Sequence, residues 1–470
     1  MEFKPLTPQD QARLRRYYES CDLILSEYSV AGKLMLREAH HPVWAEAAGC
    51  LIVRNTIHGK RWFDYPVAGP EGDESAALEA IEAWCLDNEV PLAVSAVPAD
   101  RTAMLLKRYP MARIVNLKSW RDYVYAASDL RDYPGRRYAG QRSQANKFRG
   151  LYPDARFRAL GEGDEALAEA FFDEFEKALS KHSETDREDL ANAREMMRMM
   201  DRPCFLCGGM ELDGKLLSLA MGERCGETLH VHIEKALCGY EGVHPATIQA
   251  YAQYYADLSV RWLNREDSAD DRGLRASRLR YRPAFLAEKC CFEVQNELEK
   301  LALDHETEPI FIKTARLTLT PLTDADREAY TRLCLDDARN RFWGYDYRKD
   351  WRGEPLEDYF LEMARADFAS HTALNLAVRL DGKLIGEVVL HRFTGRGSAE
   401  LGCRIAPDYA GRGYGAEAFA AAADWGLCRL RLEAVTAKCY KENAASERML
   451  QSCMRRSGED ETFYYFRKEV

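Results

Sequence analysis

The sequence has little of what a membrane-spanning, secreted or nucleic-acid-coating protein needs. Its 470 residues hold no run of about 20 uninterrupted apolar side chains, so no membrane span is expected. Met1 to Cys21 is polar and charged and lacks the apolar core of a secretory signal. The formal net charge of −10 argues against a protein that coats nucleic acid over its whole surface.

Metal and disulfide patterns are also missing. The 14 cysteines follow no framework spacing, which favours a reducing, cytoplasmic location. Cys204 and Cys207 form a Cys-x-x-Cys pair with no second pair to complete a zinc tetrahedron. His230 and His232 would share one face of a strand, but no further ligand cluster accompanies them. We therefore expect no metal site.

The chain is long enough for two or three domains, and its hydrophobic content of 46% supplies ample core. Helix and strand signals alternate throughout, which indicates an α/β or α+β layer structure. The polar stretch Asp304 to Pro309 is the predicted domain boundary. In the middle of the chain, helices are expected at Asp164–Lys181 and Asp186–Met200 and strands at Phe205–Met210, Lys215–Met221 and Thr228–Glu234.

One stretch, Ala399 to Gly426, predicts a strand, a glycine loop and a helix in succession. Apolar residues alternate from Ala399 to Ile405, and an alanine-rich helix follows the glycines. A glycine loop that opens a helix presents free N–H groups and the positive end of the helix dipole, which together bind a pyrophosphate or similar anion. The Lys-Ser/Thr pair of a nucleotide-triphosphatase loop is absent, and three glycines alone also describe an ordinary turn.

The flanks of this stretch give it a family. The segments ARLTLTPLTDADREAY, LAVRLDGKLIGEVVL and AKCYKENAASERMLQSCM, with the terminal ETFYYFRK, make residues 310–470 resemble the GNAT N-acetyltransferases, in the branch of ribosomal-protein N-terminal acetyltransferases. The resemblance implies acetyl-coenzyme A as acyl donor, with Ala410 standing where the family has Gln or Arg. The residues it implies for coenzyme binding are Cys403, Arg404, Ile405, Gly411, Arg412, Gly413, Tyr414, Gly415 and Ala416.

The same resemblance implies the catalytic groups. Glu400 is the expected base that deprotonates the amine, directly or through water, although it could equally pair with Arg404 or another cation. Asn443 and Ser446 take the positions from which the family acts on the leaving thiolate, with Leu450 where a tyrosine is often found. Asn443 would serve equally well as a helix N-cap, and Ser446 as a hydroxyl on the helix face.

Aromatic and acidic side chains between the first two helices of this segment are expected to line the acceptor pocket. Trp343, Tyr345 and Asp346 suit an amine or ammonium by cation–π and charge contacts. Such aromatic residues also commonly just pack. The acceptor class is a small-molecule or peptide amine.

Residues 1–305 carry a second resemblance. The segments DYVYAASDL, GRRYAGQRSQANKF, ELDGKLLSLAMGE, HVHIEKAL and NREDSADDRGLRASRLRYRP are similar to the C-terminal domain of phosphatidylglycerol lysyltransferases. That resemblance implies two GNAT-like halves, at about 1–150 and 151–305. The chain would then be α/β (α+β) with three GNAT-like units: a tandem pair and a C-terminal domain, with mixed, mostly antiparallel sheets flanked by helices. Ser268, Asp270 and Arg278 depart from the family's usual Asp, Gly and Lys.

The first domain offers its own candidate substrate site. A cluster of basic and acidic residues could hold an aminoacyl group or another zwitterion, or could be a buried ion-pair network. Its members are His232, Glu234, Asn264, Arg265, Glu266 and Arg275. The segment Gly135–Arg158 mixes basic residues with aromatic ones and could contact tRNA, or form a solvated helix with an apolar stripe. The basic residues of that predicted contact are Arg136, Arg137, Arg142 and Lys147.

We therefore predict a coenzyme A-dependent N-acyltransferase with its chemistry in residues 310–470. One alternative is an aminoacyl-tRNA-dependent transferase acting through residues 1–305. A second alternative is a non-catalytic ligand-sensing protein. No second coenzyme loop is found in residues 1–300, so we expect a single coenzyme site.

Overall fold

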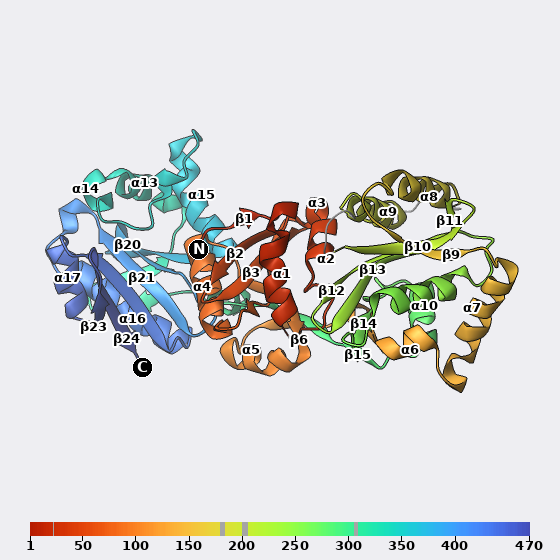
Figure 1. Cartoon of the computed structure of the whole chain (residues 1–470). Coiled ribbons are helices and arrows are strands. Elements are labelled where there is room, and N and C mark those ends of the chain that lie inside the picture. The colour runs from red at the N-terminus through yellow and green to blue at the C-terminus, as the bar shows by residue number, and fades with distance from the viewer. Residues whose placement is uncertain (22, 179–183, 200–204, 305–308) are drawn as a thin grey trace. The chain divides into compact units, whose positions relative to one another are not determined.

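A computed structural model describes residues 1–21, 23–178, 184–199, 205–304 and 309–470. The chain forms two compact units. Unit 1 comprises Met1–Ile81, Leu92–Leu105 and Ile114–Glu293, and unit 2 comprises Glu82–Pro91, Leu106–Arg113 and Val294–Val470. The described residues form three sheets of eight strands each, and helices flank them (Figure 1).

The first sheet is built almost entirely from the first 115 residues. Its spatial order is β1 (Lys4–Pro5), β2 (Val43–Ala47), β3 (Cys50–Ile57), β4 (Lys60–Asp64), β6 (Ala93–Pro98), β16 (Lys289–Glu293) and β7 (Arg113–Val115), with β5 (Val67–Ala68) paired to β3. The helices of this region are α1 (Gln11–Ser20), α2 (Val30–Met35), α3 (Arg37–His40), α4 (Glu74–Asp87) and α5 (Thr102–Arg108).

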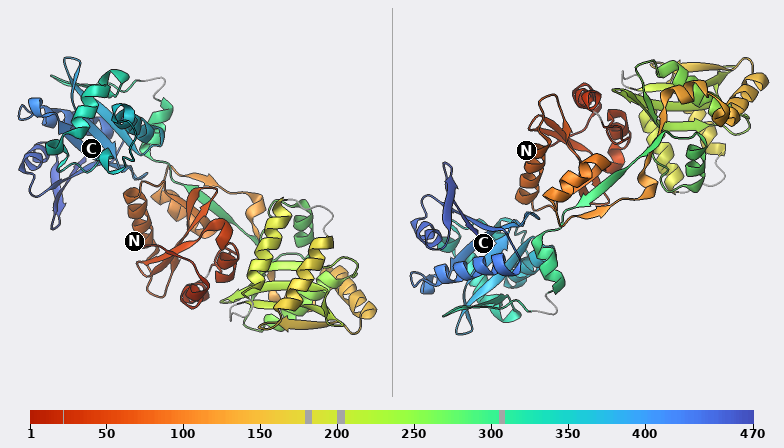
Figure 2. Two further views of the ribbon diagram at one scale, coloured as in Figure 1. Left: turned by 90° about the horizontal axis from the view of Figure 1, so that it is seen from above. Right: turned by 90° about the horizontal axis from the view of Figure 1, so that it is seen from below.

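The second sheet belongs to the other half of unit 1. Its order is β11 (Lys215–Leu216), β10 (Leu206–Leu212), β12 (Ser218–Cys225), β13 (Thr228–Ala236), β14 (Trp262–Asn264), β8 (Asp122–Ala126) and β15 (Phe285–Ala287), with β9 (Arg156–Leu160) paired to β10. Its helices are α6 (Ala127–Asp132), α7 (Ala139–Leu151), α8 (Glu165–Ala178), α9 (Glu184–Met197), α10 (Val243–Tyr255) and α11 (Arg272–Arg280). They cover both faces of the sheet (Figures 1 and 2).

The two halves of unit 1 exchange a strand. Strand β8 leaves the first half and pairs with β14 and β15 of the second sheet, whereas β16 leaves the second half and pairs with β6 of the first. Each sheet therefore contains a strand from the other half. Backbone hydrogen bonds therefore connect the two halves directly, and the halves form one compact unit.

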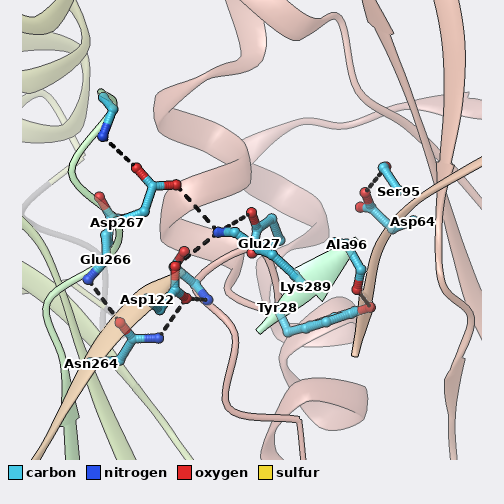
Figure 3. A network of polar contacts seen from close by, with 12 residues as sticks. Glu27, Tyr28, Asp64, Ser95, Ala96, Asp122, Asn264, Glu266, Asp267 and Lys289 are labelled. Atoms are coloured by element: carbon cyan, nitrogen blue, oxygen red, sulfur yellow. Dashed lines mark hydrogen bonds and ion pairs between the residues drawn. The ribbon is translucent and has the colours of Figure 1, made fainter. Parts of the chain in front are cut away.

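A buried polar cluster lies where the exchanged strands cross (Figure 3). Lys289, the first residue of β16, places its Nζ 2.8 Å from Oδ1 of Asp122, the first residue of β8, and 2.6 Å from Oε1 of Glu27. Asp267 lies 3.4 Å from the same ammonium, and the Asn264 amide donates to Asp122 at 2.8 Å. We call these five residues the crossover cluster.

Unit 2 contains the third sheet. Its order is β17 (Ile312–Lys313), β18 (Thr318–Pro321), β19 (Ala373–Leu380), β20 (Lys383–His391), β21 (Ser398–Ile405), β22 (Ala434–Tyr440), β24 (Phe463–Glu469) and β23 (Arg455–Glu459). The helices of this part are α12 (Glu297–Asp304), α13 (Arg327–Leu335), α14 (Asp337–Asn340), α15 (Leu356–Ala369), α16 (Tyr414–Arg429) and α17 (Ala444–Gln451). Leu376, Val388, Phe419 and Ala422 are among its fully buried core residues.

All three sheets share one motif: two neighbouring parallel strands joined through a helix. The pairs are β4 with β6 through α4, β13 with β14 through α10, and β21 with β22 through α16. In the three described sheets, all other strand pairs of defined register are antiparallel. The predicted sheets, mixed but mostly antiparallel, are therefore present.

Some predicted element bounds need correction. The strand expected at Lys215–Met221 is divided into β11 and β12, because the Leu217 N–H donates to the Met210 carbonyl and the Ser218 hydroxyl accepts from the Met210 N–H. The two predicted helices correspond to α8 and α9. Their expected bounds at Lys181 and Met200 fall outside the described residues, as do Cys204 and most of the predicted boundary at 304–309.

Candidate active site

The parallel strands β21 and β22 separate near the middle of the third sheet. They are paired at Ser398–Ala434, Ala399–Val435 and Glu400–Thr436, and these two strands are not paired beyond Glu400. From Leu401 onward the side of β21 that faces β22 therefore lacks a strand partner. The result is a wedge that opens next to Glu400, and the glycine loop follows at the end of the same strand.

The glycine loop leaves backbone donors free at the start of α16. Gly411 and Gly413 have φ values of 75° and 81°, a left-handed conformation that glycine adopts without strain. The Glu417 N–H donates to the Gly413 carbonyl, so the amides of Tyr414, Gly415 and Ala416 precede the helical bonds of α16. With the helix dipole, these amides could hold an anion at the start of a helix of 16 residues.

Arg316 supplies positive charge to this loop, and sequence reasoning missed it. Its Nη1 donates to the Arg412 carbonyl at 3.1 Å, its Nε donates to Glu417 at 2.6 Å, and its guanidinium lies 4.6 Å from the Tyr414 ring centroid. Ala410, which is exposed, cannot provide the charge that Gln or Arg contributes there in the resembling family. Arg316 precedes Arg412 by 96 residues, and only the fold brings it to the loop.

The two faces of β21 have different surroundings. Cys403 and Ile405 face α16: the Cys403 Sγ lies 3.8 Å from the Gly415 carbonyl oxygen, and Ile405 lies 3.5 Å from where a Cβ on Gly415 would be. Burial raises the pKa of Cys403 to about 12, so its thiol stays protonated at neutral pH. Glu400, Gly402 and Arg404 occupy the opposite face.

Glu400 lies among basic side chains. Its carboxylate oxygens are 3.9 Å from His391 Nε2, 3.6 Å from Arg392 Nε and 3.6 Å from Lys438 Nζ. Burial lowers the pKa of His391 to about 4, with Glu400 opposing the shift, so the imidazole is neutral at physiological pH. His391 pairs with Glu400 across strands β20 and β21, and sequence reasoning missed it because that register is not visible in the sequence.

The side chain of Arg404 has a structural role. Its Nε donates to Glu387 at 2.6 Å, it also binds Asn340, and Trp343 stacks on its guanidinium at 4.9 Å. The indole of Trp343 covers Gly402 as well, about 3.0 Å from where a Cβ would be. The predicted coenzyme contact of Arg404 can therefore involve only its main chain, while Trp343 forms a wall beside Glu400.

The other predicted acceptor residues have partners of their own. Tyr345 donates its hydroxyl to Asp367 at 2.8 Å, and its ring lies 4.9 Å from that of His391. Asp346 binds the guanidinium of Arg348 through both carboxylate oxygens. Tyr345 thus reaches the surroundings of Glu400, whereas the charge of Asp346 is already compensated.

Asn443 is the N-cap of α17, and its side chain accepts from the Ser446 N–H at 3.2 Å. The capping alternative for Asn443 is thus present. Met449 lies 3.5 Å from where a Cβ on Gly415 would be, and Ser446 is one turn earlier on the same helix. Ser446 therefore shares the helix face that is turned toward the start of α16.

The predicted residues of unit 1 lie at the ends of β13 and β14. His232 contacts the Ser29 hydroxyl at 3.0 Å and Glu266 at 2.6 Å, and Glu234 accepts from Arg265. Asn264 belongs to the crossover cluster, and Arg275 is exposed on α11. Within the residues described, no group of three or more His, Cys, Asp or Glu side chains is placed to hold a metal ion.

The start of α10, which corresponds to that of α16, is covered. Its N-cap Gly242 also has a φ of 81°, but a Cβ there would collide with the Gln144 carbonyl oxygen of α7. Lys147 of α7 also binds Glu241 at 2.7 Å. At the start of α16, by contrast, a Cβ on Gly413 would meet only the end of the Arg316 side chain, at 3.4 Å.

Most of the basic segment forms α7, which packs on the core of unit 1. Tyr138 and Phe148 are fully buried, so these two rings are not exposed for stacking on bases. Arg137 binds Asp129, and Arg142 donates to the Gly135 carbonyl at 3.0 Å. Arg136 is exposed. These contacts match the alternative of a solvated helix with an apolar stripe.

Comparison with known proteins defines the class first. Residues 316–453 match the family model of the acetyltransferase (GNAT) domain. The chain is 34% identical over 76 residues to the uncharacterized N-acetyltransferase YnaD of Bacillus subtilis (strain 168), covering 16% of this chain and 45% of that protein. The chain thus spans less than half the length of this relative. This chain contains a GNAT acetyltransferase domain, as predicted.

The remainder of the chain defines the family. Residues 23–292, more than half of the sequence, match the model "Phosphatidylglycerol lysyltransferase, C-terminal", so the chain belongs to that family. A conserved protein of unknown function from Bacteroides thetaiotaomicron VPI-5482 shares the fold, with a TM-score of 0.57 and 20% identity over 63% of this chain and 100% of that one. A GNAT-family acetyltransferase from Bacillus anthracis covers 34% of this chain and 98% of its own, at 24% identity and a TM-score of 0.30. The predicted fold class and both resemblances are confirmed.

No helix in the described ranges is both long and apolar enough to cross a membrane.

Proposed function

We propose that this protein transfers an acetyl group from acetyl-coenzyme A to an amine, and that the reaction takes place in unit 2. The carrying observation is the wedge beyond the Glu400–Thr436 pair, which opens beside free amides at the start of α16. A pyrophosphate would bind the amides of Tyr414, Gly415 and Ala416, with Arg316 and Arg412 adding charge. The thioester would then extend into the wedge along β21.

Glu400 is the proposed base. It lies on the face of β21 opposite the coenzyme loop contacts, is 19% exposed, and has His391 and Tyr345 beside it. An ammonium must lose a proton before it attacks a thioester carbonyl, and a carboxylate can remove that proton directly or through water. Because the imidazole of His391 is neutral, Arg392 and Lys438 are the two charged groups closest to the Glu400 carboxylate in the described part of unit 2.

The leaving thiolate needs little help. A thiol has a pKa near 8.5, so its anion departs readily, and positioning supplies much of the rate. Ser446 is the proposed group that orients or protonates this sulfur, and Asn443 fixes the helix end that presents Ser446. Trp343 and Tyr345 are proposed to line the acceptor pocket for a small-molecule or peptide amine. We further propose that domains 1–305 and 310–470 divide the chain by function.

Calorimetry with acetyl-coenzyme A on the full chain tests this proposal. Gly411 and Gly382 are matched glycines, since both have positive φ and neither has a neighbouring atom within 4 Å of where a Cβ would be. Gly411→Asp places a negative charge at the anion site and should weaken binding at least about tenfold, whereas Gly382→Asp in the β19–β20 turn should not. No binding to the wild type, or equal loss in both variants, contradicts the proposal.

Membership of the lysyltransferase C-terminal family supports a second candidate function, aminoacyl transfer from tRNA in unit 1. Charge reversal of Arg136 and Arg137 should then abolish aminoacyl-tRNA consumption, and rising salt should lower it steeply. Unchanged consumption removes this candidate. If Glu400→Gln binds acetyl-coenzyme A normally and no acyl-transfer assay distinguishes it from the wild type, the non-catalytic alternative is favoured instead.

A further inference from the structure

A buried cluster of two guanidinium groups and one carboxylate lies in unit 1, where β13 and β14 separate. The strands are paired through His230–Asn264 and diverge beyond that pair. Glu234 extends from β13, Arg265 follows β14, and Arg278 comes from α11. All three side chains are at least nine-tenths buried, with exposures of 7%, 1% and 7%.

The carboxylate is already occupied. Arg265 donates two hydrogen bonds to Glu234, one from Nε to Oε1 at 2.6 Å and one from Nη2. Arg278 Nη1 is 3.6 Å from Glu234 Oε2, which is too long for a hydrogen bond. His244, partly exposed on α10, has its Nε2 3.6 Å from the same oxygen and marks the solvent side of the cluster.

Three donors of this cluster have no hydrogen-bond partner in the described part of the chain. They are Arg265 Nη1, Arg278 Nε and Arg278 Nη1. A buried N–H group without an acceptor costs free energy, and an ionised one costs more. Burial, with a smaller contribution from Arg265, holds the pKa of Arg278 below its ordinary value against the opposing effect of Glu234. Such donors in a native fold point to an acceptor that binds there.

The position of the cluster in the fold points the same way. In unit 2 the corresponding wedge lies beyond Glu400–Thr436 and is the proposed site of the thioester. In unit 1 the wedge presents guanidinium groups instead, and α7 covers the start of α10 next to it. The ligand of this wedge is therefore an anion that does not need a helix N-terminus.

We propose that Arg265 and Arg278 bind a small carboxylate in the wedge between β13 and β14. A carboxylate is planar and accepts paired N–H donors, the geometry that a guanidinium presents. The walls suit a compact body, because the Arg265 guanidinium lies 4.5 Å from the Tyr281 ring centroid and 5.5 Å from that of Tyr125. This site is independent of the acetyl-coenzyme A site proposed for unit 2.

Saturation-transfer NMR on the full chain with propionate, at constant ionic strength in chloride, tests the proposal. The wild type should give a saturable signal on the propionate protons. Arg278→Met should weaken binding about 10- to 100-fold, because it removes two charge-assisted donors. Arg280→Met is the matched control on α11, since Arg280 is exposed, and it should bind as the wild type does.

A second Arg278 variant and a second anion serve as controls for folding and for the carboxylate assignment. If Arg278→Met fails to fold, Arg278→Lys, which keeps the charge but loses the planar fork, should fold and bind propionate more weakly than the wild type. Absence of saturable binding to the wild type overturns the proposal, and so does equal binding by wild type and a folded Arg278 variant. Inorganic phosphate, titrated in parallel, should bind more weakly than propionate, and preferential phosphate binding overturns the carboxylate assignment.

Discussion

Replacing Lys289 by methionine tests whether the crossover cluster holds the two halves of unit 1 together. Lys289 is buried and lies within ion-pair distance of Asp122, Glu27 and Asp267 (Figure 3). Asp122 is fully buried. Without the ammonium, that carboxylate would remain in the interior beside two others. Removing one partner of a buried ion pair typically costs about 3–5 kcal/mol.

The loss should depend on pH in a defined direction. Burial alone would raise the pKa of Asp122, and the Lys289 charge, with hydrogen bonds from Asn264 and Ser26, lowers it instead. In the wild type, the stability that Asp122 contributes is therefore present above about pH 4 and is lost on acidification. In Lys289→Met the raised pKa reverses this, so stability is lost as pH rises. The variant should be more destabilised at pH 8 than at pH 5.

Hydrogen exchange of peptides covering β8 and β16 measures this loss within unit 1. A cost of about 3–5 kcal/mol corresponds to exchange roughly 150- to 5000-fold faster. Lys215→Met is the control, since Lys215 and Glu174 form an exposed pair worth about 0–1 kcal/mol. Asp122→Asn added to Lys289→Met should restore much of the protection by removing the orphaned charge. If Lys289→Met exchanges no faster than Lys215→Met, the crossover cluster does not hold the halves together.

Three further perturbations follow from single contacts. Glu223 is buried and its pKa is raised to about 7, so the stability that its protonated form contributes is lost as the pH rises from about 4.5 to 7. In urea denaturation at pH 8, Glu223→Gln should therefore be more stable than the wild type by roughly 3 kcal/mol. Equal stability of the two proteins would contradict this. Gly242→Ala should destabilise unit 1 by about 2–4 kcal/mol, because the added methyl group strains the backbone and collides with Gln144. Gly214→Ala is the control and should cost about 1 kcal/mol, because Gly214 also has a positive φ but has no atom within 4 Å of where a Cβ would be. Similar melting curves for the two variants would refute the covering of α10 by α7. Arg316→Met should weaken acetyl-coenzyme A binding about 3- to 10-fold and reduce its salt dependence, while the exposed Arg332→Met should leave calorimetric titrations unchanged.

Much of the local structure was predictable from the sequence because local physics fixes it. The alternation of apolar residues predicted the bounds of β21 to within one residue. The glycines before an alanine-rich run predicted where α16 begins. Asp270, which stands where the resembled lysyltransferase family usually has Gly, adopts a φ of 60°, a conformation that Gly adopts without strain. The family resemblances likewise implied three units of one fold, and each of the three sheets has its own pair of parallel strands joined through a helix.

The sequence alone determined the fold class and the position of the candidate coenzyme loop. Tertiary structure decided which sites are open and which residues complete them. It brought Arg316 to a loop that lacks the usual basic residue, placed His391 beside Glu400 and covered Gly242 with Gln144. It also exchanged β8 and β16 between the halves of unit 1. These outcomes depend on strand register and on packing between distant segments, whereas residue patterns report only on neighbours along the chain.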